Sequence, residues 1–205
     1  MELNVDVFTG GLAQTNAYLF KTKEGYWLVD APEGAAEYLK EKNIRLNGLI
    51  LTHGHWDHIW DASRIIEESK CPCIAHPEDK PLFEDPNIMA QFGLPVTLDE
   101  VKVTRYVEEG ETLEAGEWQF KIFHVPGHCP GSIALFDAEA GIVFGGDVLF
   151  AGGVGRWDLP GGDFDVLMKS IKEKILTLPG GTTVYPGHGP ATTIDREKQS
   201  NPFLK

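Results

Sequence analysis

Cysteine is scarce in this sequence, with Cys71, Cys73 and Cys129 as the only three among 205 residues. A small, odd number of cysteines does not indicate a disulfide framework. The "CPC" tripeptide at Cys71 and Cys73 would supply half of a soft metal site, but the second half is missing. We therefore expect these two cysteines to lie at the edge of a strand.

Basic side chains are also few: 18 Lys and Arg face 31 Asp and Glu, for a formal charge of −13. Nucleic-acid backbones are bound largely through basic side chains, so this balance argues against a nucleic-acid partner. An acidic surface also keeps a protein in solution, and bound divalent cations would offset part of the charge.

Long apolar runs are missing, and no segment approaches the length needed to span a membrane. The first ten residues, "MELNVDVFTG", contain no Lys or Arg and are not typical of a signal peptide. We expect a cytoplasmic protein with a small-molecule substrate and no membrane partner. No linker or repeat divides the chain, so we expect one domain over residues 1–205.

Short apolar or alternating runs dominate what is present, and they predict many strands between a few helices. The predicted strands are 2–8, 16–21, 26–31, 48–52, 72–76, 101–107, 117–125, 132–140, 141–146 and 182–187. Helical spacing predicts helices over 34–42, over 59–70 and after Asp163, a suitable N-cap. Residues 80–100 contain proline and glycine and are predicted to form a long loop. This order favours an α/β sandwich with mixed sheets.

One short stretch concentrates metal-binding side chains. "ILTHGHWDHIWD", residues 50–61, places His53, His55, Asp57 and His58 within six positions, directly after a predicted buried strand. Histidine and carboxylate are common metal ligands. A helix would turn alternate residues to different sides, about 200° per two residues, whereas a loop can direct them at one or two metals. The pattern therefore indicates a metal site rather than an exposed histidine-rich turn.

Three later motifs end strands in the same manner. "HVPGHCPGS" contains His128, "IVFGGDVLF" contains Asp147, and "VYPGHGPA" contains His188. Each residue alone would be a weak indication, because single His or Asp residues after strands are often structural. Together with the first cluster they supply seven metal-type ligands on strand-terminal loops, which is how a shared cavity at one sheet edge would be built.

The combination of "THGHWDH", "PGHCPGS", "GGD" and "PGHG", in this order, resembles the metallo-β-lactamase superfamily of hydrolases. "TNAYLF" and "WLVDAP" also resemble the opening strands of that family. The resemblance implies an α/β fold, a four-layer αβ/βα sandwich in which two mixed β-sheets are flanked by helices. It also implies a metal site at one edge of the sheets.

The same resemblance assigns metal ligands residue by residue. The first metal would be bound by His53, His55 and His128, the second by Asp57, His58 and His188, and Asp147 would bridge the two. Such a set favours two divalent ions, with Zn²⁺ expected and Fe or Mn tolerated. Two metals suggest hydrolysis, because metal binding lowers the pKa of water towards ~7. Asp57 would also orient the attacking hydroxide.

Within the superfamily, Asp147 and the loop "GDVLFAGGVGRWD" resemble glyoxalase II, the hydroxyacylglutathione hydrolases. This similarity favours a thioester substrate. Secreted dizinc β-lactamases usually carry Cys where Asp147 stands, together with an export signal. Full-length glyoxalase II has an additional C-terminal helical domain that helps to bind glutathione. Only 17 residues follow His188 here, so we expect the compact branch without that domain.

Four alternatives stay open. A persulfide dioxygenase shares much of the ligand set and a similar "GR" loop, but it uses one iron. A lactonase or another hydrolase of the superfamily, or a non-catalytic metal-binding module, would also carry these residues. An RNA-processing nuclease shares the His/Asp pattern but is disfavoured by the charge of −13.

Several further side chains have two interpretations each. Arg156 is a candidate clamp for a substrate carboxylate, or the partner of an acid such as Asp158. Trp56, Trp60 and Trp157 either wall the pocket or pack as ordinary aromatics. Cys129 lies next to His128 and is expected to pack rather than act as a nucleophile. His76 and His124 are expected to be structural.

Overall fold

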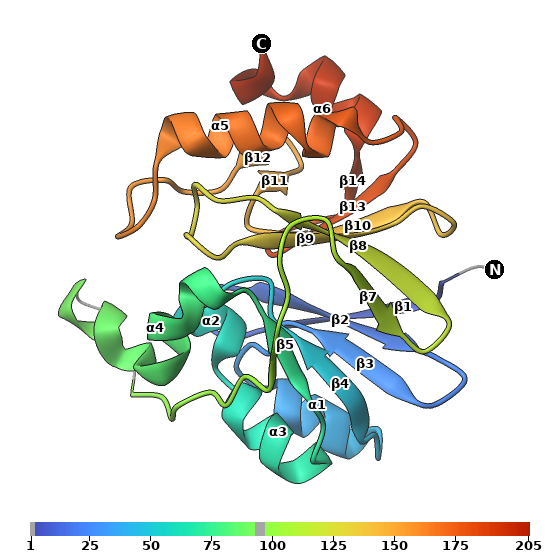
Figure 1. The fold of residues 1–205 in the computed structure, drawn as a ribbon, viewed down its shortest axis with the longest axis vertical. Coiled ribbons are helices and arrows are strands. Elements are labelled where there is room, and N and C mark those ends of the chain that lie inside the picture. Colours follow the sequence, from blue (N-terminus) through green and yellow to red (C-terminus); the bar gives the residue numbers. More distant parts are fainter. Residues whose placement is uncertain (1–2, 93–96) are drawn as a thin grey trace.

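Two mixed six-stranded sheets face each other at the centre of the protein, and helices cover the outer side of each sheet (Figure 1). The computed structural model describes residues 3–92 and 97–205. Glu2 of the first predicted strand and residues 93–96 of the predicted loop lie outside the described residues. The arrangement confirms the predicted sandwich of helix, sheet, sheet and helix layers.

The first sheet has strands in chain order and changes from antiparallel to parallel pairing after its third strand. Its strands are β1 (Val5–Gly10), β2 (Thr15–Lys21), β3 (Tyr26–Val29), β4 (Leu46–Ile50), β5 (Cys73–Ala75) and β6 (Arg105–Tyr106). The helices α1 (Ala35–Glu41) and α3 (Ala62–Ser69) cover its outer face. Leu39 and Ile65 of these helices are buried in the same apolar cluster as Leu49 of β4.

The second sheet runs in the order β14-β13-β10-β9-β8-β7, and its β10–β13 pair is parallel. Its strands are β7 (Thr112–Ala115), β8 (Trp118–His124), β9 (Ile133–Asp137), β10 (Ile142–Gly146), β13 (Thr183–Pro186) and β14 (Thr192–Thr193). The helices α5 (Phe164–Glu173) and α6 (Ile194–Ser200) lie over its outer face (Figure 1). A separate hairpin pairs β11 (Leu149–Phe150) with β12 (Gly153–Val154).

Short helical segments complete the chain. They are α2 (Trp56–Ile59), η1 (Pro77–Asp79), α4 (Lys80–Glu84), η2 (Pro86–Phe92), η3 (Ile175–Thr177) and η4 (Pro202–Leu204). In the described residues, no helix is long and apolar enough to cross a membrane.

The space between the sheets is filled by aromatic and branched side chains. Phe20 of β2 contacts Phe120 of β8 and Phe144 of β10, with ring centroids 5.6 and 6.0 Å apart. Alternate residues of β8 point into this layer, as the period of two in a strand requires. These side chains hold the two sheets together and thereby fix the distance between their strand ends.

Most of the predicted elements are confirmed. The strands β2, β3, β4, β5, β8, β9, β10 and β13 and the helix α1 fall on their predicted segments. Asp163 caps α5 as expected, because its carboxylate accepts a hydrogen bond of 2.9 Å from the Val166 N–H.

Three predictions of local structure differ from the structure. The helix expected over 59–70 is confirmed as α3 and begins only at Ala62, because the chain leaves the helical conformation of α2 at Asp61, whose carboxylate accepts the Ala36 N–H. The loop expected over 80–100 contains α4 and η2, because proline is compatible with the first turn of a helix. The strand expected over 101–107 is only β6, because it pairs with the three-residue β5.

Candidate metal centre

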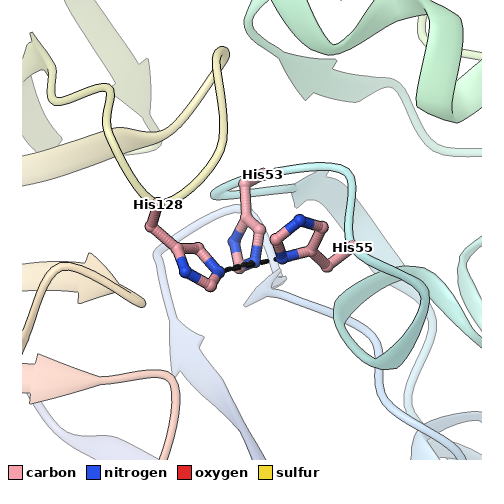
Figure 2. Close-up of side chains that lie close together, drawn as sticks. All are labelled: His53, His55 and His128. Atoms are coloured by element: carbon pink, nitrogen blue, oxygen red, sulfur yellow. Dashed lines mark hydrogen bonds between the residues drawn. The ribbon is translucent and has the colours of Figure 1, made fainter. Parts of the chain in front are cut away.

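Three buried histidines from two loops meet at the edge of the sandwich. His53 and His55 follow β4, and His128 follows β8. The His128 Nε2 atom lies 2.8 Å from His55 Nδ1 and 3.2 Å from His53 Nε2 (Figure 2). The ligand atoms of this group lie within 4.8 Å of one another, which is the spacing needed to bind one ion.

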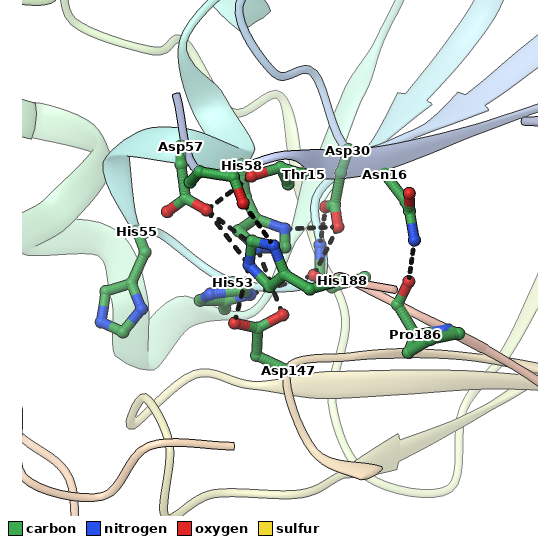
Figure 3. A network of polar contacts seen from close by, with 12 residues as sticks. Thr15, Asn16, Asp30, His53, His55, Asp57, His58, Asp147, Pro186 and His188 are labelled. Carbon is green, nitrogen blue, oxygen red and sulfur yellow. Dashed lines mark hydrogen bonds and ion pairs between the residues drawn. The ribbon is translucent and has the colours of Figure 1, made fainter. Parts of the chain in front are cut away.

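A second group lies beside the first. Asp57 and His58 belong to α2, and His188 follows β13. The Asp57 Oδ2 atom lies 3.5 Å from His58 Nε2 and 3.3 Å from His188 Nε2 (Figure 3). These ligand atoms also lie within 4.8 Å of one another.

Asp147 connects the two groups. Its carboxylate oxygens lie 3.3 Å from His58 Nε2, 3.2 Å from His188 Nε2 and 3.5 Å from His128 Nε2. It follows β10, so it reaches the site from the second sheet while His58 comes from the first. The structure therefore brings together all seven predicted ligands at one edge, and a third group of His53, His58 and Asp147 joins the first two. We call these seven residues the metal centre.

Asp30 fixes the orientation of His58. The Asp30 Oδ2 atom lies 2.8 Å from His58 Nδ1, which leaves Nε2 directed at the metal centre (Figure 3). The Thr52 N–H and hydroxyl donate to the same carboxylate at 2.8 Å each. Asp30 is 1% exposed and has a positive φ of 61°, so its position at the end of β3 is tightly constrained. Such outer partners hold ligands in place and set their protonation.

The other histidines have similar supports. His128 Nδ1 lies 2.7 Å from the Arg156 carbonyl oxygen, and His188 Nδ1 lies 3.1 Å from the Ala13 carbonyl oxygen. Both contacts fit an Nδ1–H donor, which leaves Nε2 of each ring with a free lone pair. Thr15 supports a carboxylate in the same way, since its hydroxyl donates to Asp57 Oδ2 at 2.7 Å.

Asp79 ties together the two loops that carry the first group. Its carboxylate accepts the Gly54 N–H at 2.8 Å and the Gly131 N–H at 2.6 Å. The Cys129 thiol donates to the same carboxylate at 3.1 Å. A Cβ atom on Gly131 would lie 2.5 Å from Asp79 Cγ, so this approach requires glycine. One buried carboxylate thus fixes the spacing of the loops on either side of the first group.

The protonation of the histidines differs between the first and the second ligand group of the metal centre. Burial and the neighbouring histidines lower the pKa of His53 well below its ordinary value. Burial and then His128 lower the pKa of His55 to about 3. Both rings are therefore neutral at pH 7, and a neutral imidazole is the form that binds metal.

In the second ligand group, protonated histidines face ionised carboxylates when no metal is bound. Burial acts to raise the pKa of Asp57, but His58 and His188 bring it down to about 2. Burial acts to lower the pKa of His188, but its contacts with Asp147 and Asp57 raise it to about 10. The protons on the histidines therefore balance the carboxylates, and a bound cation would take their place.

Four side-chain polar atoms are buried without a hydrogen-bond partner in the described residues, and three of them belong to the metal centre: His55 Nε2, His58 Nε2 and Asp147 Oδ1. Such atoms are costly unless a ligand satisfies them. The donor set, the spacing of the ligand atoms and these orphan atoms all fit divalent cations.

A pocket of about 430 Å³ opens onto the metal centre. Trp56, Phe150, Val154 and Leu159 give it apolar walls, and Arg156 lies at its rim. Asp57 and Asp147 also line it, so a bound molecule would contact both halves of the metal centre. This combination of apolar walls and a few convergent polar groups is typical of a small-molecule site.

The remaining candidates divide between the pocket and the surrounding structure. The Arg156 guanidinium makes a two-pronged pair with Asp158, at 2.9 and 3.0 Å. Trp60 contacts Trp56 outside the lining, and Trp157 packs on Phe164 with ring centroids 4.8 Å apart. Of the three tryptophans, Trp56 alone is among the lining residues of this pocket.

Cys129, His76 and His124 are placed as structural groups. Cys129 is buried, and burial together with Asp79 raises the pKa of its thiol well above the ordinary value, so it is not a thiolate nucleophile. His76 and His124 stack with ring centroids 3.9 Å apart, and His124 Nε2 lies 2.7 Å from the Pro130 carbonyl oxygen. All three cysteines are free thiols.

Reasoning from the sequence missed the supporting residues Asp30, Thr15 and Asp79. Asp30 lies in "WLVDAP", where a charged residue directly after a buried strand could have marked it. Nothing in the local sequence marks Thr15 or Asp79, because their partners lie 42 and at least 25 positions away along the chain.

A sandwich of this kind, with a His/Asp cluster at its strand ends and an adjacent pocket, defines a class of metal-dependent hydrolases. The model of the metallo-beta-lactamase superfamily matches residues 10–188, and the chain belongs to that superfamily. The resemblance drawn from the motifs is thereby confirmed, and the protein is a metal-binding hydrolase of this fold.

Relatives extend the match over almost the whole chain. The hydroxyacylglutathione hydrolase GloC of Haemophilus influenzae is 39% identical over 209 residues, covering 98% of each chain. TTHA1623, solved in a di-iron-bound form, is 39% identical with a TM-score of 0.86, covering 98% of this chain and 100% of that one. The B3 metallo-β-lactamase BLEG-1 is 34% identical with a TM-score of 0.90 and the same coverage.

Proposed function

We propose that the protein is a dinuclear metal hydrolase of acyl thioesters, with the glutathione thioester of a 2-hydroxy acid as the leading substrate. The observation that carries the proposal is the position of Asp147, whose carboxylate contacts histidines of both ligand groups. One shared carboxylate allows two ions to be held side by side. The similarity to the hydroxyacylglutathione hydrolase GloC supports the thioester class.

The seven residues of the metal centre would hold two ions in the predicted grouping. Bound divalent ions lower the pKa of water and polarise a carbonyl group. Zinc suits this donor set, and iron is equally compatible with it, since TTHA1623 was solved with two irons. The protein's own contribution is to fix the ligands, which Asp30, Thr15 and Asp79 do from outside.

Asp57 is the residue that we assign to positioning the attacking water. Its Oδ2 atom is held by the Thr15 hydroxyl at 2.7 Å, and its side chain lines the pocket. A carboxylate held in this way can accept a hydrogen bond from water at a fixed angle. A thiolate leaves without a strong general acid, so the mechanism needs no further proton donor.

Arg156 is the proposed contact for a carboxylate of the thiol group. Arg156→Ala should raise KM about tenfold and change kcat little, because the contact is made equally in the ground and transition states. The substitution leaves the backbone carbonyl that supports His128 in place. Steady-state kinetics on the zinc-loaded protein measure both constants.

Asp158→Asn is the matched control for this prediction. It removes the acid that pairs with Arg156 and frees the guanidinium, so KM for an anionic thioester should stay the same or fall. Equal KM values for wild type and Arg156→Ala would remove Arg156 from the substrate site.

The test of the proposed reaction is a substrate panel on zinc-loaded and iron-loaded protein. It comprises lactoylglutathione, a thioester without glutathione, a lactone, nitrocefin and a phosphodiester. We expect turnover of both thioesters. Activity on the lactone alone, without thioester turnover, would replace the thioester assignment. Oxygen consumption with glutathione persulfide at one iron per chain would replace it with the dioxygenase.

β-Lactam hydrolysis is a second candidate, favoured by the 34% identity to BLEG-1 over 98% of this chain. Nitrocefin turnover faster than thioester turnover would select it.

A further inference from the structure

The hairpin formed by β11 and β12 makes one wall of the pocket. Phe150 and Val154 line the pocket, and Arg156, another lining residue, lies two positions after β12. Each strand of this hairpin has two residues, and so short a hairpin is not stable on its own. The positions of these lining residues therefore depend on contacts between the hairpin and the rest of the protein.

The base of the hairpin is held by the apolar core, where Val148 and Leu149 are buried. Its tip is held by polar groups at α6. Glu197 Oε2 accepts the Gly152 N–H at 2.8 Å, and the Asn201 side-chain amide donates to the Gly153 carbonyl at 2.9 Å. The same amide donates to Glu197 Oε2 at 2.8 Å.

Both anchoring side chains are 0% exposed. A fully buried carboxylate is costly unless several donors satisfy it, and Glu197 has donors from Gly152, Asn201 and the Thr192 hydroxyl. Gly152 has a φ of +76°, which restricts this turn position to glycine or a strained residue. The anchor therefore holds the tip of the hairpin in one position.

We propose that Glu197 and Asn201 are positioning residues that set the substrate wall of the pocket from the C-terminal helix α6. The inference rests on the proposed function insofar as the pocket beside the metal centre binds the substrate. It assigns a role in substrate binding to a helix that contributes no lining residue to this pocket. In Figure 1, α6 lies on the outer side of the second sheet.

The variants separate positioning from general stability. Glu197→Met keeps the length of the side chain but removes both acceptors. Glu197→Gln can direct its oxygen at Gly152 and Asn201 and its NH₂ group at the Thr192 hydroxyl, so it should restore the anchor. Asn201→Ser can still cap η4 through the Phe203 N–H but cannot reach Gly153.

Thr192→Val is the matched control. It removes the Thr192 hydrogen bond to Glu197 Oε1 and leaves both contacts with the hairpin in place. This variant should lower Tm through the unpaired buried oxygen, without loosening the hairpin.

Hydrogen–deuterium exchange on the zinc-loaded full chain measures the hairpin directly. We expect the peptide spanning 147–156 to exchange at least about tenfold faster in Glu197→Met and Asn201→Ser than in wild type. It should be unchanged in Glu197→Gln and Thr192→Val. Unchanged exchange in both Glu197→Met and Asn201→Ser would overturn the proposal, whatever the substrate proves to be.

Kinetics on the substrate selected by the panel measure the consequence. KM should rise about fivefold to tenfold in Glu197→Met and Asn201→Ser, with kcat and metal content close to wild type. Thr192→Val should keep the wild-type KM despite its lower Tm. If KM rose wherever Tm fell, across all four variants, Glu197 and Asn201 would act only on overall stability. Failure of the thioester assignment would show separately, as wild-type inactivity on thioesters.

Discussion

At the scale of single residues, Asp147 is the group on which both halves of the metal centre depend. Asp147→Ala removes the carboxylate that lies within 3.5 Å of His58, His128 and His188. We expect loss of at least one metal and of most hydrolytic activity, with the fold retained, because two cations would lose the carboxylate between them. Elemental analysis and circular dichroism measure these outcomes.

Asp137→Ala is a suitable control for the Asp147 variant. Asp137 is also buried and accepts backbone N–H groups from Gln119 and Ala140, but it belongs to β9, away from the metal centre. It should lower stability and leave metal content unchanged. Full metal occupancy in Asp147→Ala would show that our ligand grouping is wrong.

We expect His76 to make the native protein less stable in acid. Its ring is buried against His124, and its Nδ1 atom accepts the Glu78 N–H. Burial and then His124 lower the pKa of His76 to about 4, while Glu109 acts to raise it and Lys174 to lower it. The unfolded chain, with a pKa near ~6.5, binds the proton first, so native stability falls as pH drops from ~6.5 towards 4.

His76→Asn should remove the contribution of His76 to this dependence, because Asn can accept the Glu78 N–H but takes up no proton, while His53 and His55 act in both proteins. Over the window from ~6.5 to 4, the difference in the free energy of unfolding between wild type and variant should change by up to roughly 3 kcal/mol. Urea unfolding of the chelated proteins at several pH values measures it. If the free energies of unfolding of wild type and His76→Asn changed in parallel with pH, His76 would not cause the loss of stability in acid.

Residue roles were predictable from the sequence where the residue type itself is informative. His53, His55, Asp57 and His58 stand out because metal-binding side chains cluster after an apolar strand. The roles of Asp30, Asp79 and Glu197 depend on which loops come together in the fold, which no local pattern records. The sequence therefore predicted which side chains meet at the metal centre and missed the residues that hold them in place.

At the scale of elements, buried strands were the easiest to predict. Strands such as β4 and β10 are short apolar runs with clear ends, and every ligand-bearing loop was located from such an end. The misses are short or interrupted elements, such as the hairpin β11–β12 and the break between α2 and α3. Their conformation is set by tertiary hydrogen bonds, for example that of Asp61 with the Ala36 N–H, rather than by periodicity.

Asp79 of η1, which connects the two loops of the first ligand group, gives a prediction at the scale of elements. Asp79→Ala leaves the Gly54 and Gly131 N–H groups without their acceptor, and should cost about 2–4 kcal/mol in the free energy of unfolding. Because these loops carry His53, His55 and His128, we expect one metal to be lost more readily than the other. Titration with a competing chelator, followed by elemental analysis, resolves the two affinities.

Cys129→Ala is the control for this variant. It removes the thiol that contacts Asp79 and keeps both backbone hydrogen bonds to the carboxylate. Both metals and the hydrolytic activity should persist. If Asp79→Ala weakened both metals equally, the carboxylate would act on overall stability and not on the first group.

At the scale of the whole molecule, the fold was predictable because its layers follow from the order of strands and helices and from the family motifs. The distribution of charge was predictable only in part. The formal charge of −13 is a property of composition, whereas the meeting of Asp30, Asp57 and Asp147 at one edge is a property of the fold. These carboxylates are brought together by the fold before any cation binds.

Metal removal should therefore affect the stability of the entire protein. The ligands come from loops after β4, β8, β10 and β13, so ions bound among them join the two sheets at their open edge. Ligands that bind only the native state stabilise it by about 4 kcal/mol at a thousandfold excess over Kd. For a chain of this size that corresponds to a rise in Tm of roughly 10 °C.

Differential scanning calorimetry of the chelated protein, titrated with zinc, measures this coupling. Tm should climb with zinc concentration beyond two equivalents, because linkage depends on free ligand. Magnesium should have little effect, since it prefers an all-oxygen set and five of the seven ligand side chains are imidazoles. Asp147→Ala should show a smaller rise at each concentration. A Tm that stays constant over a hundredfold range of zinc would mean that the sheets are held together by the core alone, with the metal centre adding chemistry and no stability.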